Sequence, residues 1–167
     1  MKDFRVDKLN NITKEVDEFH PLLRILFEKL NGVSSVEYKQ GNREMGADFV
    51  ITKEDATLGG DEYIGVIVKV GSISQSNSEV ERQIDECQLE RTIQGGKKKV
   101  FLSEIWVVVS GRITQNAQDK IHHKFKNQKI KFIQQENLLR LIDQHYPDYW
   151  SNVPIEEGVY LERVRAF

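Results

Sequence analysis

Residues 46–70 read GADFVITKEDATLGGDEYIGVIVKV, and this stretch decides the fold. Two runs rich in β-branched side chains, 47–52 and 63–70, flank a turn rich in Asp and Gly, which predicts two strands joined as a hairpin. The second run is almost continuously apolar, as is typical of a strand that is covered on both faces. The stretch therefore predicts strands at the centre of a layered α/β domain.

The rest of the chain supplies helices and further strands around this hairpin. Apolar residues recur at helical spacing from Val6 to Leu30, with Pro21 between two stripes, which indicates either a kinked helix or two helices. Ser78, with Glu81 three residues later, is a capping-box pattern that predicts the start of another helix, and Gly95 and Gly96 are expected to end it. Periodicity also predicts strands at 36–38, 105–109 and 129–133, and helices at 114–125 and 138–145. This order predicts one α/β domain with a central mixed β-sheet flanked by helices.

The chain of 167 residues has room for one ordinary domain and a short appendage. We assign residues 1–146 to the α/β domain and residues 147–167 to a C-terminal extension of aromatic and acidic composition. The last residues, YLERVRAF, are typical of the start of a further helix. The extension is therefore expected to lead into a further domain.

Composition excludes several classes of protein. Lys and Arg number 24 against 26 Asp and Glu, and this net charge of -2 excludes a generally basic nucleic-acid binder but leaves local patches open. The one cysteine, Cys87, excludes a disulfide scaffold and a cysteine-based zinc site. No apolar run approaches the roughly 18 residues of a membrane span, and the N-terminus lacks a signal-peptide core. We expect a cytoplasmic protein with no membrane partner.

Lys69 is the most informative residue, because it lies in a strand that otherwise belongs to the core. A buried ammonium without a partner costs several kcal/mol, so Lys69 must reach a strand end, a cleft or a carboxylate. Asp48 on the preceding strand is the natural partner, since a hairpin brings the two strands side by side. We expect the carboxylate and the amine within about 6 Å of each other, where opposite charges shift each other's pKa.

A carboxylate beside a lysine on adjacent strands allows two interpretations. One is a structural ion pair at the edge of the sheet. The other is a divalent-metal site, in which Asp48 binds Mg²⁺ or Mn²⁺ and Lys69 orients or activates an attacking water. Such a site suits phosphodiester hydrolysis, because a metal and a lysine stabilise charge that develops on phosphate oxygens.

The order of these motifs resembles the PD-(D/E)XK nuclease core, in particular its Mrr-like restriction endonuclease branch. The resemblance consists of a helix, GAD on a strand, a hairpin, a β-branched strand ending in Lys69, and a helix with an inward glutamine. The later stretches EIWVVVSGRITQNAQDKI and KIKFIQQENLLRLID resemble the end of that core. The similarity extends from Asp17 to His145 and implies a restriction-endonuclease-like three-layer fold.

The resemblance implies roles for individual residues. Asp48 matches the metal-binding aspartate, Lys69 the motif lysine, and Gln83 the glutamine of the following helix. Glu18 matches an additional acidic residue of the first helix, which the family uses for metal binding, and Glu28 is the other candidate for that position.

One position departs from the family pattern. Two residues before Lys69, where the family carries Glu, Asp or Gln, this chain has Ile67, which cannot ligate a metal. Either another carboxylate replaces the missing one or the site is weakened or inactive. The carboxylates nearby in sequence are Glu44, Asp61, Glu62, Glu79 and Glu81.

Lysines gather in the second half of the chain. Five lie from Lys120 to Lys131, with two histidines and no acid among them, and Lys97, Lys98 and Lys99 precede the 105–109 strand. The predicted nucleic-acid contacts are Lys97, Lys98, Lys99, Lys120, Lys124 and Lys126, which would follow a phosphate backbone. The alternative is that this stretch is an ordinary solvated helix face.

These observations predict a metal-dependent DNA endonuclease domain of a restriction or defence type. The alternative is a nuclease-like module without catalysis that binds nucleic acid or serves in protein assembly, which Ile67 favours. The resemblance further implies a fused or separate NTPase or sensor module. This sequence has no Walker motif, so such a module is expected outside it. A nuclease that cuts both strands would commonly pair as a homodimer.

Overall fold

The computed structural model describes residues 3–39, 45–75 and 77–151. Along the chain lie α1 (Phe4–Asn10), the π-helix η1 (Glu15–Phe19), α2 (His20–Glu28), β1 (Val33–Tyr38), β2 (Phe49–Glu54), β3 (Asp61–Lys69), α3 (Ser78–Cys87), β4 (Arg91–Ile93), β5 (Lys98–Val100), β6 (Glu104–Val109), α4 (Gln115–Lys124), β7 (Ile130–Ile133), α5 (Gln135–His145) and the 3-10 helix η2 (Pro147–Ser151). Among these residues, no helix is both long and apolar enough to cross a bilayer.

Five strands form a mixed sheet in the order β1-β2-β3-β6-β7. β1, β2 and β3 pair antiparallel as a meander, while β3–β6 and β6–β7 pair parallel. β3 is the central strand, and its residues from Tyr63 to Val68 are buried, which confirms that it is covered on both faces. The predicted α/β class with a mixed sheet flanked by helices is confirmed.

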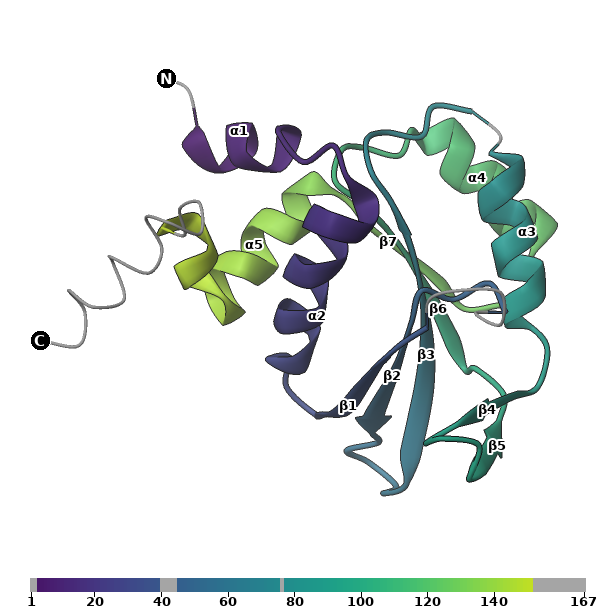
Figure 1. Ribbon diagram of the computed structural model, residues 1–167. Helices are drawn as coiled ribbons and strands as arrows, with labels where there is room; N and C mark the ends of the chain where they lie inside the picture. The colour runs from purple at the N-terminus through teal and green to yellow at the C-terminus, as the bar shows by residue number, and fades with distance from the viewer. Residues whose placement is uncertain (1–2, 40–44, 76, 152–167) are drawn as a thin grey trace, which may run out of the picture.

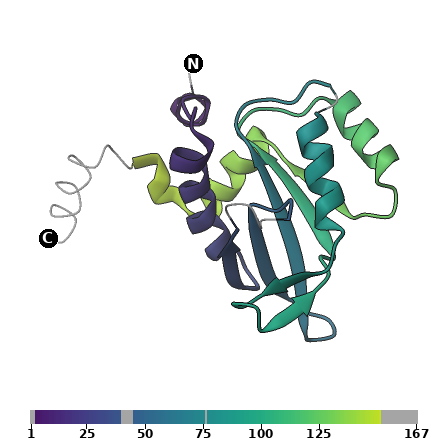
Figure 2. The same ribbon diagram turned by 45° about the vertical axis from the view of Figure 1, so that its right-hand side comes forward.

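Helices cover both faces of the sheet (Figure 1). α1, α2 and α5 lie on one side, and their apolar residues pack with alternate residues of β3 such as Val66 and Val68. α3 and α4 lie on the other side and pack with Ile67 and its neighbours. The turned view in Figure 2 shows the same three layers, so the three-layer arrangement that we expected is confirmed.

Two details of α3 and the segment after it differ from the prediction. Asn77, and not Ser78, caps α3, because its side chain accepts from the backbone N–H of Val80 at 3.1 Å. Gly95 and Gly96 do not end α3, which stops at Cys87, but turn the short hairpin of β4 and β5. Their positive φ angles, 68° and 86°, explain why glycine stands in this turn.

The N-terminal segment is interrupted before Pro21 rather than at it. α1 ends at Asn10, whereas η1 runs directly into α2 with Pro21 in the first turn of α2. Proline fits there because the first turn of a helix leaves N–H groups unused. Of the predicted extension, η2 packs Tyr149 and Trp150 against the core beside α5, and residues 152–167 lie outside the described part.

Gly46 joins the start of β2 to α3. Its φ is +85°, and a Cβ there would stand 2.2 Å from the backbone oxygen of Gln83. Both the left-handed conformation and the close helix contact therefore require glycine. This contact sets how near α3 lies to the sheet where β2 begins.

We expect Gly46→Ala to destabilise the fold more than Gly59→Ala. Gly59 also has a positive φ, 73°, but a Cβ added there would meet no atom within 4 Å, so that variant loses only about 1–2 kcal/mol of backbone preference. Gly46→Ala adds steric overlap worth about 1–3 kcal/mol. Urea unfolding of both variants measures the difference, and equal losses would contradict the close contact.

Candidate functional site

The candidate site lies at the edge of the sheet where β2 begins and β3 ends. Antiparallel pairing of Phe49 with Val66 brings these two ends together. Val50 and Ile67 belong to the same core on the α3 side, so alternation puts Asp48 and Lys69 on that face as well. The shared face that we expected for these two residues is therefore present.

Asp48 is buried, at 7% exposed, and its carboxylate joins the two strands. Its Oδ2 accepts a hydrogen bond from the backbone N–H of Val68 at 2.7 Å, and its own N–H donates to the carbonyl of Val66 at 2.8 Å. A carboxylate that accepts a backbone N–H is held in one orientation. Lys69 follows Val68 in β3, so the Asp48 carboxylate is bonded to the backbone directly before Lys69.

Lys69 forms its ion pair with Glu79 of α3. Its Nζ lies 2.7 Å from Oε1 of Glu79, and the lysine side chain is 14% exposed. The hydrogen bond from Lys69, followed by the charge of Lys69, lowers the pKa of Glu79. The ion pair that the structure shows for Lys69 is thus with a carboxylate of the helix, and the expected separation of Asp48 and Lys69 stays a prediction.

Among the carboxylates considered as replacements for the one missing at Ile67, Glu79 is the one with a salt bridge to Lys69. Ile67 is fully buried in the core, so its position carries no polar group toward the site. Among the nearby carboxylates, Asp61 and Glu62 lie at the other end of β3, roughly 25 Å away at about 3.3 Å per residue. Glu81 pairs with Lys124 at 3.3 Å, and Glu44 lies outside the described residues. Glu79 is thus the described carboxylate that meets Lys69.

Gln83 points from α3 toward the sheet, as its position on the helix predicted. It is 2% exposed, and its Nε2 donates to the carbonyl of Gly46 at 3.0 Å. Its Oε1 is buried without a hydrogen-bond partner among the described residues. The amide therefore anchors the segment that leads to Asp48 and retains one unused acceptor.

Glu18 takes a different position from the one expected. It is exposed, and its Oε1 accepts from the backbone N–H groups of Thr13 and Lys14, which lowers the pKa of its carboxyl. It therefore caps the turn before η1. Glu28, the other candidate, lies at the far end of α2 and pairs with Arg24 at 3.5 Å.

On the α2 side of the sheet, the buried polar residue near this edge is His20, at the start of α2, and not Glu18. It is 4% exposed, and its Nδ1 lies 2.8 Å from the hydroxyl of Tyr38 at the end of β1. Burial, and then the charge of Lys69, lowers the pKa of the imidazole. The sequence carries a weak signal for this residue, because a histidine directly before Pro21 is equally typical of a helix boundary.

The predicted lysine contacts divide into two groups. Lys97, Lys98 and Lys99 belong to the β4–β5 hairpin, and Nζ of Lys98 stands 5.3 Å from the ring centroid of Tyr63. Tyr63 lies six residues before Lys69, so this group is about 20 Å from the site along β3. The other group, Lys120, Lys124 and Lys126, lies exposed on and after α4, with Lys124 paired to Glu81.

Two lysines beyond that group have structural partners. Nζ of Lys129 and of Lys131 lie 3.0 Å and 3.6 Å from Oε1 of Glu104, which is buried at the start of β6. These two lysines therefore partly neutralise a buried carboxylate, so their role in the described structure is within the fold.

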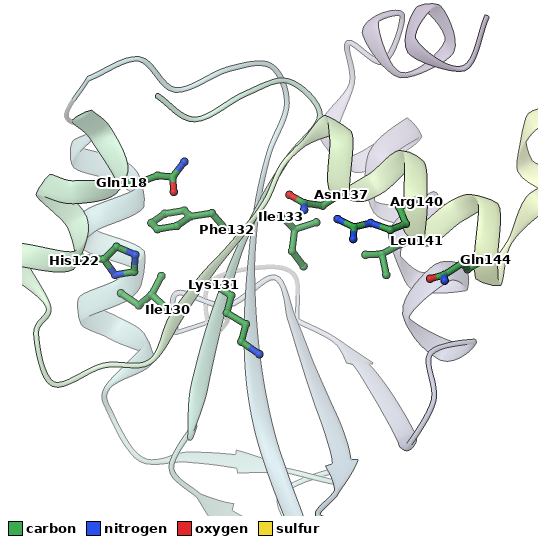
Figure 3. A pocket seen from close by; sticks show the side chains of 10 residues that line it. All are labelled: Gln118, His122, Ile130, Lys131, Phe132, Ile133, Asn137, Arg140, Leu141 and Gln144. Atoms are coloured by element: carbon green, nitrogen blue, oxygen red, sulfur yellow. The ribbon is translucent and has the colours of Figure 1, made fainter. Parts of the chain in front are cut away.

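A cavity of about 510 Å³ lies at the opposite edge of the sheet (Figure 3). α4 and α5 form its sides and β7 its floor, with His122, Lys131 and Arg140 in the lining. The described lining carries cations and no carboxylate, so its chemistry suits an anion and not a metal ion.

The donor set at the β2–β3 edge limits what metal it can hold. Among residues 3–39, 45–75 and 77–151 no three His, Cys, Asp or Glu side chains are grouped to bind an ion. Asp48 and Glu79 supply carboxylates, and Mg²⁺ commonly takes one or two carboxylates and completes its shell with water and substrate phosphates. The residues present thus fit a hydrated Mg²⁺ or Mn²⁺, and do not fit an all-protein cage.

The comparisons with known proteins are sparse. No protein-family model and no curated protein matches the chain. Among solved structures, the chain is similar to one described as the MspJI restriction endonuclease in complex with a 27-mer oligonucleotide, with a TM-score of 0.46 and 14% identity. The match covers 82% of this chain and 30% of that one, so this chain spans less than a third of that protein.

We expect His20 to make stability pH-dependent. The pKa of His20 in the folded state is lowered from 6.5, so the unfolded state binds more protons as the pH falls below 6.5. The contribution of His20 to the free energy of unfolding is therefore fully present above pH 6.5 and is lost as the pH falls below it. The free energy of unfolding should be lower at pH 5 than at pH 7.5. Carboxyls such as Glu79, with a pKa below 4.5, titrate outside this window.

His20→Phe should flatten that dependence, because it keeps the ring and removes the titrating group. His123→Phe, at an exposed position of α4, is the matched control and should leave the dependence unchanged. Urea unfolding at the two pH values measures it. If the free energy of unfolding of His20→Phe still falls between pH 7.5 and pH 5 as in the parent chain, a group other than His20 causes the pH dependence.

Proposed function

We propose that this chain is a metal-dependent DNA endonuclease domain that hydrolyses phosphodiester bonds. The observation that carries the proposal is the Lys69–Glu79 contact of 2.7 Å beside the buried carboxylate of Asp48, at one edge of the sheet. A lysine and two carboxylates at such an edge supply what phosphoryl chemistry needs, namely a cation for phosphate charge and oxygen ligands for a divalent ion.

Each residue has a role in the proposed reaction. Water attacks phosphorus, a P–O bond forms, and the bond to the leaving sugar oxygen breaks. Asp48 and Glu79 would hold a Mg²⁺ or Mn²⁺ ion, which supplies Lewis-acid stabilisation of phosphate charge when bound. Lys69, oriented by Glu79, donates to the phosphate oxygen or to the attacking water. Gln83 fixes the segment that carries Asp48.

Glu79 takes the place of the carboxylate that Ile67 lacks in this proposal. α3 begins at Ser78, so Glu79 in its first turn projects at the end of β3. A negative charge is favourable there, because the N-terminus of a helix carries partial positive charge. A carboxylate on the neighbouring helix can thus supply the missing metal ligand without placing a charged group in the apolar core around Ile67.

The wider setting is part of the proposal. Exposed Lys120 and Lys126 near α4 would contact DNA phosphates, and a restriction or defence role follows the PD-(D/E)XK resemblance. A fused or separate NTPase or sensor module and pairing into a homodimer belong to the same setting.

A second candidate is a binding or assembly module without catalysis. Two observations favour it: Ile67 is fully buried, and the Lys69–Glu79 pair satisfies both charges without any ligand. This candidate predicts nucleic-acid binding, with its usual salt dependence, and no cleavage at any metal concentration.

We expect Asp48→Asn and Lys69→Met each to lower Mg²⁺-dependent plasmid nicking by about 100-fold or more, the usual loss when a group that stabilises transition-state charge is removed. Asn still accepts from the Val68 N–H, and Met preserves the length of the buried stem. Lys53→Met, at the far end of β2, is the matched control and should nick like the parent chain. Absence of nicking by the parent with both metals, while it binds DNA, would establish the binding module instead.

We expect Glu79→Gln to lower nicking by about 10- to 100-fold, as is usual when a metal ligand or the group that orients it is altered. If Glu79 contributes to metal binding, the Mg²⁺ concentration for half-maximal nicking also rises. Glu90→Gln, at an exposed residue just after α3, is the control. Unchanged nicking in Glu79→Gln would exclude Glu79 as the replacement carboxylate.

A further inference from the structure

A second, smaller cavity lies beside the candidate site, between α2 and the strands β1 and β2. Its volume is about 220 Å³, and its lining residues are Val16, His20, Pro21, Arg24, Tyr38 and Phe49. It lies on the α2 side of the sheet, where Phe49 belongs to the core. None of the residues assigned to cleavage above lines it.

One buried polar atom in this cavity lacks a partner. His20 is 4% exposed and its Nδ1 is engaged with the hydroxyl of Tyr38 at 2.8 Å, but Nε2 has no hydrogen-bond partner within the described part of the chain. A buried polar group left without a bond costs about 1–3 kcal/mol. Because His20 is one of the lining residues, a ligand seated in the cavity can supply the bond that Nε2 lacks.

The remaining lining suits a flat ring. The rings of His20, Tyr38 and Phe49 lie with centroids 5.1–5.5 Å apart, with His20 edge-on to the other two. Pro21 and Val16 add apolar surface, and the exposed side chain of Arg24 adds a cation at the rim. Aromatic walls, one hydrogen-bonding atom and a rim cation together fit a nucleobase and the phosphate attached to it.

Size restricts the occupant further. A cavity of about 150 Å³ accommodates one benzene ring, so 220 Å³ holds one substituted ring and is too small for a whole nucleotide. The cavity lies at the same edge of the sheet as the proposed cleavage site, because Phe49 of its lining follows Asp48 directly in the chain, although the two sites face opposite sides of the sheet. A base held in it would therefore be attached to backbone that passes the Lys69 edge.

We infer that this cavity binds a single pyrimidine base that has left the base stack, with Nε2 of His20 bonded to an edge of the base. This inference deepens the proposed function, since it concerns the substrate of the same site, and it selects DNA with an unpaired or extruded base. Enzymes that act on such substrates read the base by edge hydrogen bonds and by aromatic contact.

Affinity for a bulged duplex tests the inference. The full chain is titrated, without added divalent cation, with a duplex that carries one bulged thymine and with the same duplex in which the bulged position is abasic. The two duplexes differ by one ring. We expect the thymine bulge to bind about tenfold more tightly, the size of one base–aromatic contact.

Variants assign that preference to the cavity. Val16→Trp fills its mouth from a partly exposed position and should abolish the preference. Ile25→Trp makes the same kind of change on the exposed side of α2, outside the lining, and should retain it. His20→Phe keeps a ring but removes Nε2, so it should lower the preference severalfold without abolishing binding to the abasic duplex.

The outcomes separate this inference from the proposed cleavage. Equal affinity for the two duplexes, no binding to either, or a preference that survives in Val16→Trp overturns the base site. A thymine preference that Val16→Trp removes, in a chain that does not nick plasmid, supports the base site while the cleavage proposal fails. Plasmid nicking by a chain that shows no thymine preference supports the cleavage proposal and overturns the base site.

Discussion

The hydrogen bond between the Asp48 carboxylate and the backbone N–H of Val68 organises this edge of the molecule. It lies next to the pair Phe49–Val66 at the end of the β2–β3 ladder, where the backbone N–H of Asp48 also donates to the carbonyl of Val66. Because the bond joins a side chain to a backbone, it sets the position of Lys69 one residue later. Glu79 reaches Lys69 from α3, so the helix is tied to the same point.

The burial of β3 explains why charged residues appear only at its two ends. Its residues from Tyr63 to Val68 are buried between two helical layers, where an unpaired charge costs several kcal/mol. Ile67 belongs to that interior, and Lys69 is the first position at which a long side chain reaches solvent on the α3 face. A carboxylate beside Lys69 is therefore accommodated more easily on the helix than on the strand.

Much of the fold was predictable, because strand and helix periods differ clearly in this chain. The alternation over 47–52 and 63–70 predicted β2, β3 and the shared face of Asp48 and Lys69. The β4–β5 hairpin was missed, since three-residue strands show no period and Gly95–Gly96 fits a helix end equally well. Alternation puts Asp48 and Lys69 on the face of the sheet that α3 covers, and Gln83 points from α3 toward the sheet, but the grouping of the three side chains and their roles remain predictions.

Contacts that depend on the relative placement of elements were beyond prediction. Glu79 was one of five nearby acids, and only the angle at which α3 leaves the sheet brings it to Lys69. Glu18 and His20 lie two residues apart, so a single π-helical turn decides which of them faces the core. The orphan Nε2 of His20 likewise follows from packing against Tyr38, which sequence spacing does not encode.

The meander of β1, β2 and β3 has a consequence for folding. Asp48 and Lys69 belong to one hairpin, so they meet through contacts that are local in sequence, whereas β3 and β6 pair only after the intervening helix and hairpin have been placed. Local contacts form faster than distant parallel pairings, because less chain entropy is lost in closing the loop. The polar edge can therefore assemble early, and the pairing of β6 with β3 then encloses a strand that already carries its chemistry.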